Sequence, residues 1–298
     1  MSPANPHPRG RRILVALPTM FAADGSLDLE ASARAAHLVR SSQADGAFIA
    51  GTTGEFLSLE PDERLALFAT QREALGGKRI IGHIGAGSTR QAIALMEAAL
   101  SRGVTEFAAL TPYYLPASPP ATYRHFAALA EAAAGRARIY AYLFRARTST
   151  QVSPAELGRI AELPGIVGVK VSGEDLATVV EYRAATPAEF EVFTGNDADF
   201  PRLGAHGLDG VVSGVAACFP ATFDRMVAAL ATGDEAAIAT AQADVLAAVD
   251  LIDGDIGRIK TGLGALGIGG PTVRMAIEAP DVALAETIGA TVAKLEHR

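Results

Sequence analysis

The sequence predicts an α/β fold: a (β/α)8 TIM barrel over residues 11–230, followed by a C-terminal helical extension over residues 231–298. Eight short apolar segments recur at spacings of about 30 residues, and each begins a strand–helix unit. Alternating strands and helices favour a parallel sheet, and eight such units favour its closure into a barrel. The Ala-rich remainder is expected to form three helices, with a break around residues 262–271.

The predicted strands are short apolar runs, many of them β-branched, that end in glycine, proline or hydroxyl residues. They cover residues 13–17, 46–50, 79–84, 107–110, 138–143, 166–171, 190–193 and 209–212. Apolar residues at helical spacing, and Pro61 at a helix start, predict the intervening helices. These cover residues 28–42, 61–75, 93–100, 120–134, 153–161 and 174–185.

Composition and charge argue against several classes of protein. The chain has 298 residues, 49% of them hydrophobic, which is enough for a large core. Its net charge of −7 argues against a nucleic-acid partner, and no apolar run is long enough to span a membrane. Cys218 is the only cysteine, and residues 1–10 form a Pro-rich flexible tail without the apolar stretch of a signal peptide. We expect a cytoplasmic enzyme-sized protein.

Lys170 is a charged residue at the end of a predicted strand that otherwise contains glycine and β-branched residues. The chain has 4 lysines and 22 arginines, so a lysine in this place suggests a need for an amine. An amine forms an imine with a ketone, whereas a guanidinium does not. The alternative is a structural lysine whose ammonium reaches solvent or pairs with Glu174 or Asp175.

In barrels of this kind, the chemistry takes place where the strands end. A lysine amine would add to a ketone, a tyrosine phenol would move protons, and threonine hydroxyls with backbone amides would hold an adjacent carboxylate. The six histidines lack the spacing of metal ligands, so we expect no metal and no cofactor. The candidate side chains at the strand ends are Thr52, Thr53, Tyr113, Tyr114, Tyr142, Arg147 and Lys170.

Three of the strand ends also have simpler interpretations. Residues 51–55 could form an ordinary tight turn. Tyr113 and Tyr114 could be core or interface aromatics. Residues 85–88 could hold a phosphate at a helix N-terminus, but so short a segment is a weak signal and a turn is favoured.

The order of these segments resembles the dihydrodipicolinate synthase / N-acetylneuraminate lyase family of class I, pyruvate-dependent aldolases. Each segment is a weak signal alone, and together they are specific. The matching segments span about residues 13–220: Pro18-Thr19, GTTGE at 51–55, HIGAGST at 83–89, TPYY at 111–114, GIVGVK at 165–170, GND at 195–197 and GVVSG at 210–214.

The resemblance implies a catalytic group centred on Lys170. The lysine would form a Schiff base with pyruvate or another 2-oxo acid. Thr52 would join a hydroxyl relay to Tyr142, and Tyr114 would enter that relay from a neighbouring subunit. The protein would therefore be a homo-oligomer, a dimer or a tetramer.

The resemblance also implies a set of substrate-binding residues. Thr53, together with Thr52, would hold the carboxylate of the 2-oxo acid, and Gly54 and Val212 would belong to the same binding site. Arg147 matches the family arginine that receives the carboxylate of the second substrate.

Residues 141–149 depart from the family pattern. The family usually has LYNVPSRTG where this chain has AYLFRARTS, so the loop that binds the second substrate is remodelled. Tyr140 could compete with Tyr142 for the role of the phenol, but the spacing to Lys170 along the sequence favours Tyr142. Phe56 and Leu57 also replace small residues after the GTTGE segment.

Relatives that are inhibited by lysine bind it at a subunit interface beside the first tyrosine of TPYY, which is Tyr113 here. Gly87 and Gln91 stand where asparagine and glutamate are typical, so an ammonium group loses a charged partner. We therefore expect lysine to leave the activity unchanged.

The favoured function is a Schiff-base, pyruvate-dependent lyase or synthase of the dihydrodipicolinate synthase type. A second interpretation is an aldolase or dehydratase of a 2-keto-3-deoxy sugar acid or another 4-hydroxy-2-oxo acid. A third is a non-catalytic barrel that binds a keto acid. The joint presence of Lys170, Tyr142 and Thr52 argues against the third.

Overall fold

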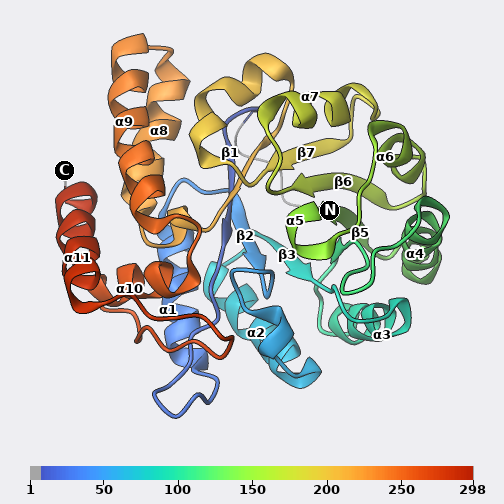
Figure 1. The fold of residues 1–298 in the computed structure, drawn as a ribbon, viewed down its shortest axis with the longest axis horizontal. Coiled ribbons are helices and arrows are strands. Elements are labelled where there is room, and N and C mark those ends of the chain that lie inside the picture. The colour runs from blue at the N-terminus through green and yellow to red at the C-terminus, as the bar shows by residue number, and fades with distance from the viewer. Residues whose placement is uncertain (1–7, 298) are drawn as a thin grey trace.

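Eight parallel strands close into one barrel in the computed structural model, which describes residues 8–297 (Figure 1). The strands pair in chain order and β1 pairs with β8, which confirms the predicted TIM barrel. Residues 1–7 of the predicted flexible tail lie outside the described residues. The strands are β1 Arg12–Ala16, β2 Gly46–Ile49, β3 Arg79–His83, β4 Glu106–Leu110, β5 Arg138–Leu143, β6 Ile166–Val171, β7 Glu191–Thr194 and β8 Gly210–Ser213.

Helices follow most strands and surround the barrel (Figure 1). The helices that follow the first six strands are α1 Leu29–Ser41, α2 Pro61–Leu75, α3 Thr89–Leu100, α4 Pro119–Ala133, α5 Arg145–Thr148, α6 Pro154–Ala161 and α7 Leu176–Ala184. The later ones are α8 Pro220–Thr232, α9 Glu235–Ile252, α10 Ile256–Ala265 and α11 Val282–Glu296. Three 3-10 segments are η1 Phe56–Ser58, η2 Asp197–His206 and η3 Val215–Ala217.

Three segments differ from the expectation based on sequence. The chain after β7 forms the 3-10 helix η2, with Pro201 inside it, because proline cannot continue α-helical hydrogen bonding. The segment after β5, expected as a loop, contains the helical turn α5. Helix α10 continues past Gly262, where the predicted break begins. A Cβ at Gly262 would lie 2.9 Å from the Cβ of Cys218, so this glycine permits close packing rather than ending the helix.

Side chains along each strand alternate between the barrel interior and the layer beneath the helices. On β6, Val169 and Val171 belong to the outer layer, so Lys170 between them faces the interior. The interior holds Leu14, Phe48, Ala108, Tyr140, Tyr142, Phe193 and Val212. Their neighbours in the outer layer include Val15, Ala47, Ala109, Ala141, Val192 and Val211.

A network of buried charges closes the barrel at the N-terminal ends of its strands. Arg79, the first residue of β3, donates to Glu106 Oε2 at 2.7 Å and to Glu191 Oε2 at 2.9 Å. Tyr140 donates its hydroxyl to Glu191 at 2.7 Å. Burial and the nearby carboxylates raise the pKa of the Tyr140 phenol. Tyr140 is therefore held in a structural network at the end of the barrel opposite to the site expected for chemistry.

The C-terminal helices gather on one side of the barrel (Figure 1). Helix α8 packs against α9, and α10 packs against α11. The segment between α10 and α11 has no regular structure over most of its length, and it hydrogen-bonds to the loop after β2. No helix within residues 8–297 is long and apolar enough to cross a membrane.

Candidate active site

Lys170 lies inside the barrel, one residue before the end of β6, and is 6% exposed. Its ammonium lies 4.6 Å from the centre of the Phe48 ring and 4.4 Å from that of the Tyr142 ring. Among residues 8–297, no ion pair joins it to Glu174 or Asp175, and Asp175 instead caps α7. The structural alternative in which Lys170 pairs with a carboxylate of the following loop is therefore wrong.

Tyr142 is the residue on β5 that pairs with Lys170 across the sheet. It is 1% exposed, and its hydroxyl lies 3.2 Å from Thr52 Oγ1. The predicted contact between Thr52 and Tyr142 is thus present within one chain. Tyr140 is two residues nearer the opposite end of the barrel, so its hydroxyl does not join this group.

The loop after β2 is a tight turn that brings Thr52 and Thr53 to the barrel mouth. A Cβ at Gly54 would lie 2.8 Å from the Cα of Ala50, so only glycine allows this close approach. The Gly54 carbonyl accepts a hydrogen bond from Thr19 at 2.7 Å. Thr53 is partly exposed, and a Cβ built at Gly214, just past β8, would lie 3.4 Å from its Oγ1.

Glu55 ends this turn in the left-handed region, with φ of 52°, and its side chain is fully buried. One carboxylate oxygen lies 2.5 Å from the Lys260 ammonium of α10. The other accepts the backbone N–H groups of Arg274 and Met275 at 2.8 and 2.9 Å. The strained backbone at Glu55 is therefore held by charge-assisted bonds to the C-terminal extension.

Arg147 lies on α5 at the barrel mouth and is exposed. Its guanidinium lies 5.8 Å from the centre of the Phe144 ring, and Phe144 in turn stacks on Tyr142. Helix α5 forms because Thr148 and Ser149 return hydrogen bonds to Phe144 and the following residue. Arg145 is also exposed on this turn, where residues two apart point in different directions.

A cavity of about 480 Å³ connects Thr52 with Arg147. The C-terminal extension, expected to be only an appendage, supplies about half of its wall. Residues 253–256, Arg258 and residues 275–277 line it, and Arg258 adds a second guanidinium. Sequence reasoning missed this contribution, although Lys260, one of only four lysines and placed among apolar residues and glycines, was a signal that this helix has a buried polar partner.

The two tyrosines after β4 differ in environment. Tyr113 is half-buried, and its ring meets Phe56 edge-on with centres 5.9 Å apart. Tyr114 is 92% exposed and has φ of 73°. An exposed aromatic residue in the left-handed region is an uncommon combination. Tyr114 is therefore not a core residue of this chain, and its predicted role in a neighbouring subunit stays a prediction.

Two further titratable groups lie beside Lys170. Asp197 accepts a hydrogen bond from Ser213 at 2.8 Å, and burial raises its pKa to about 7 although Ser213 and Lys170 oppose this rise. His83 is fully buried, and burial, with the charges of Arg64 and Lys170, holds the pKa of its imidazole well below its usual range. The site thus contains a carboxyl that titrates near neutrality and a neutral imidazole.

The remaining predicted residues have structural surroundings that limit their roles. Val212 lies on the interior face of β8 and is 4% exposed. Ser88 is the N-cap of α3 and accepts from Gln91, so the turn interpretation of residues 85–88 fits the structure. Among the described residues, no group of three histidine, cysteine, aspartate or glutamate side chains could hold a metal ion.

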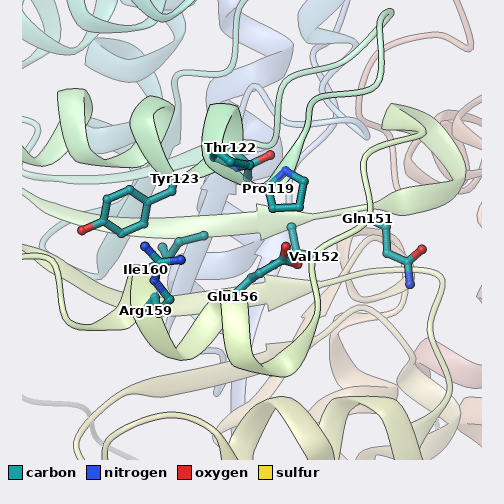
Figure 2. A pocket seen from close by; sticks show the side chains of 9 residues that line it. Pro119, Thr122, Tyr123, Gln151, Val152, Glu156, Arg159 and Ile160 are labelled. Carbon is teal, nitrogen blue, oxygen red and sulfur yellow. The ribbon is translucent and has the colours of Figure 1, made fainter.

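A smaller pocket of about 70 Å³ lies outside this site, between α4 and α6 (Figure 2). Tyr123 and Arg159 face each other there, with the guanidinium 5.0 Å from the ring centre. None of the predicted site residues lines this pocket, and it does not contribute to the chemistry argued above.

A buried lysine beside a phenol, at the C-terminal mouth of a parallel barrel, is the arrangement of lysine-dependent carbonyl lyases, and the protein is an enzyme of the lyase class. Its family follows from sequence comparison. The pattern of the dihydrodipicolinate synthetase family matches residues 9–292, and the chain belongs to that family.

Relatives of known name agree with this assignment. The chain is 36% identical to the 4-hydroxy-tetrahydrodipicolinate synthase of Moorella thermoacetica over 224 residues, which are 75% of this chain and 76% of that protein. It is 35% identical to the synthase of the same name from Nostoc over 202 residues, 67% and 68% of the two chains. The protein is thus a synthase-type member of the family.

Solved structures share the fold. YagE, a prophage protein of the family from E. coli K12 solved in complex with pyruvate, matches with a TM-score of 0.88 at 23% identity, covering 96% of this chain and 98% of that one. The 4-hydroxy-tetrahydrodipicolinate synthase of Methylacidiphilum fumariolicum matches with a TM-score of 0.87 at 24% identity, covering 96% of each chain. These likenesses establish the barrel and its C-terminal helices.

Proposed function

We propose that Lys170 forms a Schiff base with pyruvate and that the protein joins pyruvate to an aldehyde that carries a carboxylate. The observation that supports this most is the position of Lys170, which is buried beside two aromatic rings and paired across the sheet with Tyr142. A lysine placed there for stability alone would be costly, because no carboxylate forms an ion pair with it within residues 8–297.

The proposed reaction uses the groups that surround the amine. The amine adds to the ketone carbon of pyruvate, and loss of water gives the imine. Removal of a methyl proton gives an enamine, which forms a carbon–carbon bond to the aldehyde, and a water or amine then displaces Lys170. Tyr142, hydrogen-bonded to Thr52, accepts and returns protons in these steps. Thr53 and the backbone at Gly54 hold the pyruvate carboxylate beside Val212.

The second substrate would lie in the cavity between Thr52 and Arg147. The exposed guanidinium of Arg147 suits two-point binding of a carboxylate. Tyr114 would complete the hydroxyl relay of a neighbouring subunit, so the active protein would be a homo-oligomer in the cytoplasm. An amino-acid semialdehyde fits the names of the relatives from Moorella thermoacetica and Nostoc.

A substrate panel tests this proposal. The purified protein is offered pyruvate with an amino-acid semialdehyde, with glyceraldehyde, or with no aldehyde, and pyruvate consumption is followed. We expect consumption to be fastest with the semialdehyde. Faster turnover with glyceraldehyde would instead indicate an aldolase of sugar acids. No consumption with any aldehyde would contradict the synthase assignment.

A further inference from the structure

One wall of the cavity between Thr52 and Arg147 is built from irregular chain. Residues 269–280, which we call the strap, form no helix or strand between α10 and α11. The strap runs toward the start of α2 (Figure 1). Its residues 275–277 line the cavity of about 480 Å³. Because neither a helix nor a sheet fixes these residues, their position depends on the contacts that anchor the strap.

Arg274 anchors the strap directly before this wall. Its side chain is 22% exposed, and Nη1 and Nη2 donate at 2.7 Å each to the two carboxylate oxygens of Glu63. Nε donates to the carbonyl of Gly25 at 2.7 Å, and Nη1 also donates to that of Ser58 at 3.1 Å. The guanidinium lies 4.3 Å from the centre of the Phe21 ring. All three nitrogens of the side chain are therefore held by other segments of the chain.

Glu63 is itself fixed at the start of α2. It is the third residue of that helix, and its Oε2 accepts the backbone N–H of Glu60 at 3.0 Å. A carboxylate in the first turn also interacts favourably with the positive end of the helix. The hydrogen bonds from Arg274 hold the pKa of Glu63 below its usual range. A rigid helix thus presents a charged, oriented partner to the strap.

The backbone of the strap reaches the turn after β2 through a separate contact. The N–H groups of Arg274 and Met275 donate to Glu55 Oε2 at 2.8 and 2.9 Å. The other oxygen of Glu55 lies 2.5 Å from the Lys260 ammonium. That ion pair does not involve the Arg274 side chain, so the turn that carries Thr52 stays held when the guanidinium is removed.

We propose that Arg274 is a positioning residue for the second substrate. It holds residues 275–277 at the cavity wall and acts through them, without touching the substrate itself. This inference rests on the proposed function, in which the aldehyde occupies this cavity. A side chain needed only for stability would affect the use of both substrates alike, whereas a positioning residue of this wall should affect the aldehyde alone.

Steady-state kinetics of Arg274→Met test this distinction, with pyruvate and the amino-acid semialdehyde varied in turn. KM for the aldehyde should rise by about tenfold, because its wall is no longer held in one place, and KM for pyruvate should stay within about twofold. Arg274→Lys should lie between the two proteins, since one nitrogen cannot replace three. Arg225→Met is the control. It breaks a partly exposed pair with Asp244 and should leave both constants unchanged.

Hydrogen exchange measured by mass spectrometry reports on the strap without any turnover. The amides of Arg274 and Met275 are bonded to a buried carboxylate, so they should exchange slowly in the wild-type protein. Exchange in the strap should be at least about tenfold faster in Arg274→Met and unchanged in Arg225→Met. If Arg274→Met fails to fold, Glu63→Gln removes the charge of the partner and should produce a smaller change in the same direction.

The two measurements separate this proposal from the function on which it rests. Wild-type protein that consumes pyruvate with no aldehyde would contradict the proposed function, whatever the strap does. Unchanged exchange of the strap in Arg274→Met would overturn the role of Arg274, whatever the aldehyde. Equal rises of KM for both substrates, or the same rise in Arg225→Met, would also overturn it.

Discussion

Lys170 and Tyr142 are paired across β5 and β6, and the lysine ammonium lies 4.4 Å from the centre of the tyrosine ring. This pairing places an amine and a phenol on the interior face of the barrel and at the same height. The hydroxyl of Tyr142 reaches Thr52 on a different strand end. Three segments that are distant in sequence therefore meet at one point.

Exchanging each interior tyrosine of β5 for phenylalanine should separate chemistry from stability. Tyr142→Phe removes the hydroxyl beside Lys170, so turnover should fall by roughly 10²–10⁴ while imine formation and thermal stability are kept. Tyr140→Phe removes a donor to Glu191, so it should lower the unfolding free energy by about 1–3 kcal/mol with little effect on turnover. Steady-state kinetics and thermal unfolding of both variants provide the measurement. Loss of turnover in Tyr140→Phe but not in Tyr142→Phe would contradict the proposed site.

Arg147→Ala should raise KM for the aldehyde substrate by about ten- to a hundredfold, the loss expected for a charge-assisted carboxylate contact, and should change KM for pyruvate little. Arg145→Ala is the matched control, since both side chains are exposed on the same helical turn. Initial rates with each substrate varied in turn give both constants. If Arg258→Ala has this effect and Arg147→Ala does not, the C-terminal arginine is the one that binds the second substrate.

Glu55→Gln should destabilise the protein strongly. It leaves the Lys260 ammonium, fully buried and 2.5 Å from the carboxylate, without its counter-ion, which costs about 3–5 kcal/mol. The midpoint of thermal unfolding should fall by roughly 5–15 °C for a chain of this size. Glu30→Gln, which breaks the exposed pair with Arg34, is the control and should change it by less than about 2 °C. Equal shifts in both variants would show that the buried pair does not hold the loop.

Asp197→Asn should change how stability depends on pH. The pKa of Asp197 is raised to about 7 in the folded protein, so between about pH 4 and pH 7 the folded state binds a proton that the unfolded state releases. Stability from this group is therefore present at low pH and is lost as pH rises through 7. Asparagine keeps the acceptor for Ser213 and stays neutral.

The comparison of the two proteins isolates this group, because other titrating residues are shared. The midpoint of thermal unfolding of the variant, relative to wild type, should rise between pH 5 and pH 8, with a free-energy difference on the order of a few kcal/mol. A constant difference across this range would show that Asp197 ionises normally.

The sequence was sufficient for the features that depend on local pattern. Apolar runs predict the eight strands, and a single charge in the sixth run marks Lys170. Side chains alternate in direction along β5, which explains why Tyr140 and Tyr142 both point into the interior. The alternation alone cannot tell which of the two lies beside Lys170. Their different roles depend on which end of the barrel each hydroxyl reaches.

Features that depend on distant contacts were not predictable in the same way. Glu55 and Lys260 are 205 positions apart, and neither segment shows by itself that the other covers it. The predicted break around residues 262–271 is present, but it begins after Ala265 and not at Gly262, because the glycine there serves packing against Cys218 and the helix continues past it. Arg64 has the sequence context of an ordinary exposed helix residue, and only the fold shows that it is buried and that, among residues 8–297, no carboxylate forms an ion pair with it.

Trapping the proposed imine tests the central role of Lys170 most directly. The protein is incubated with pyruvate and sodium borohydride, digested, and mapped by mass spectrometry, with a sample lacking pyruvate as the control. The Lys170 amine is the nucleophile in this account, so the reduced adduct should be found on Lys170 and not on Lys78, Lys260 or Lys294. Folded protein that carries no adduct on Lys170, or that carries it on another lysine, would contradict the account.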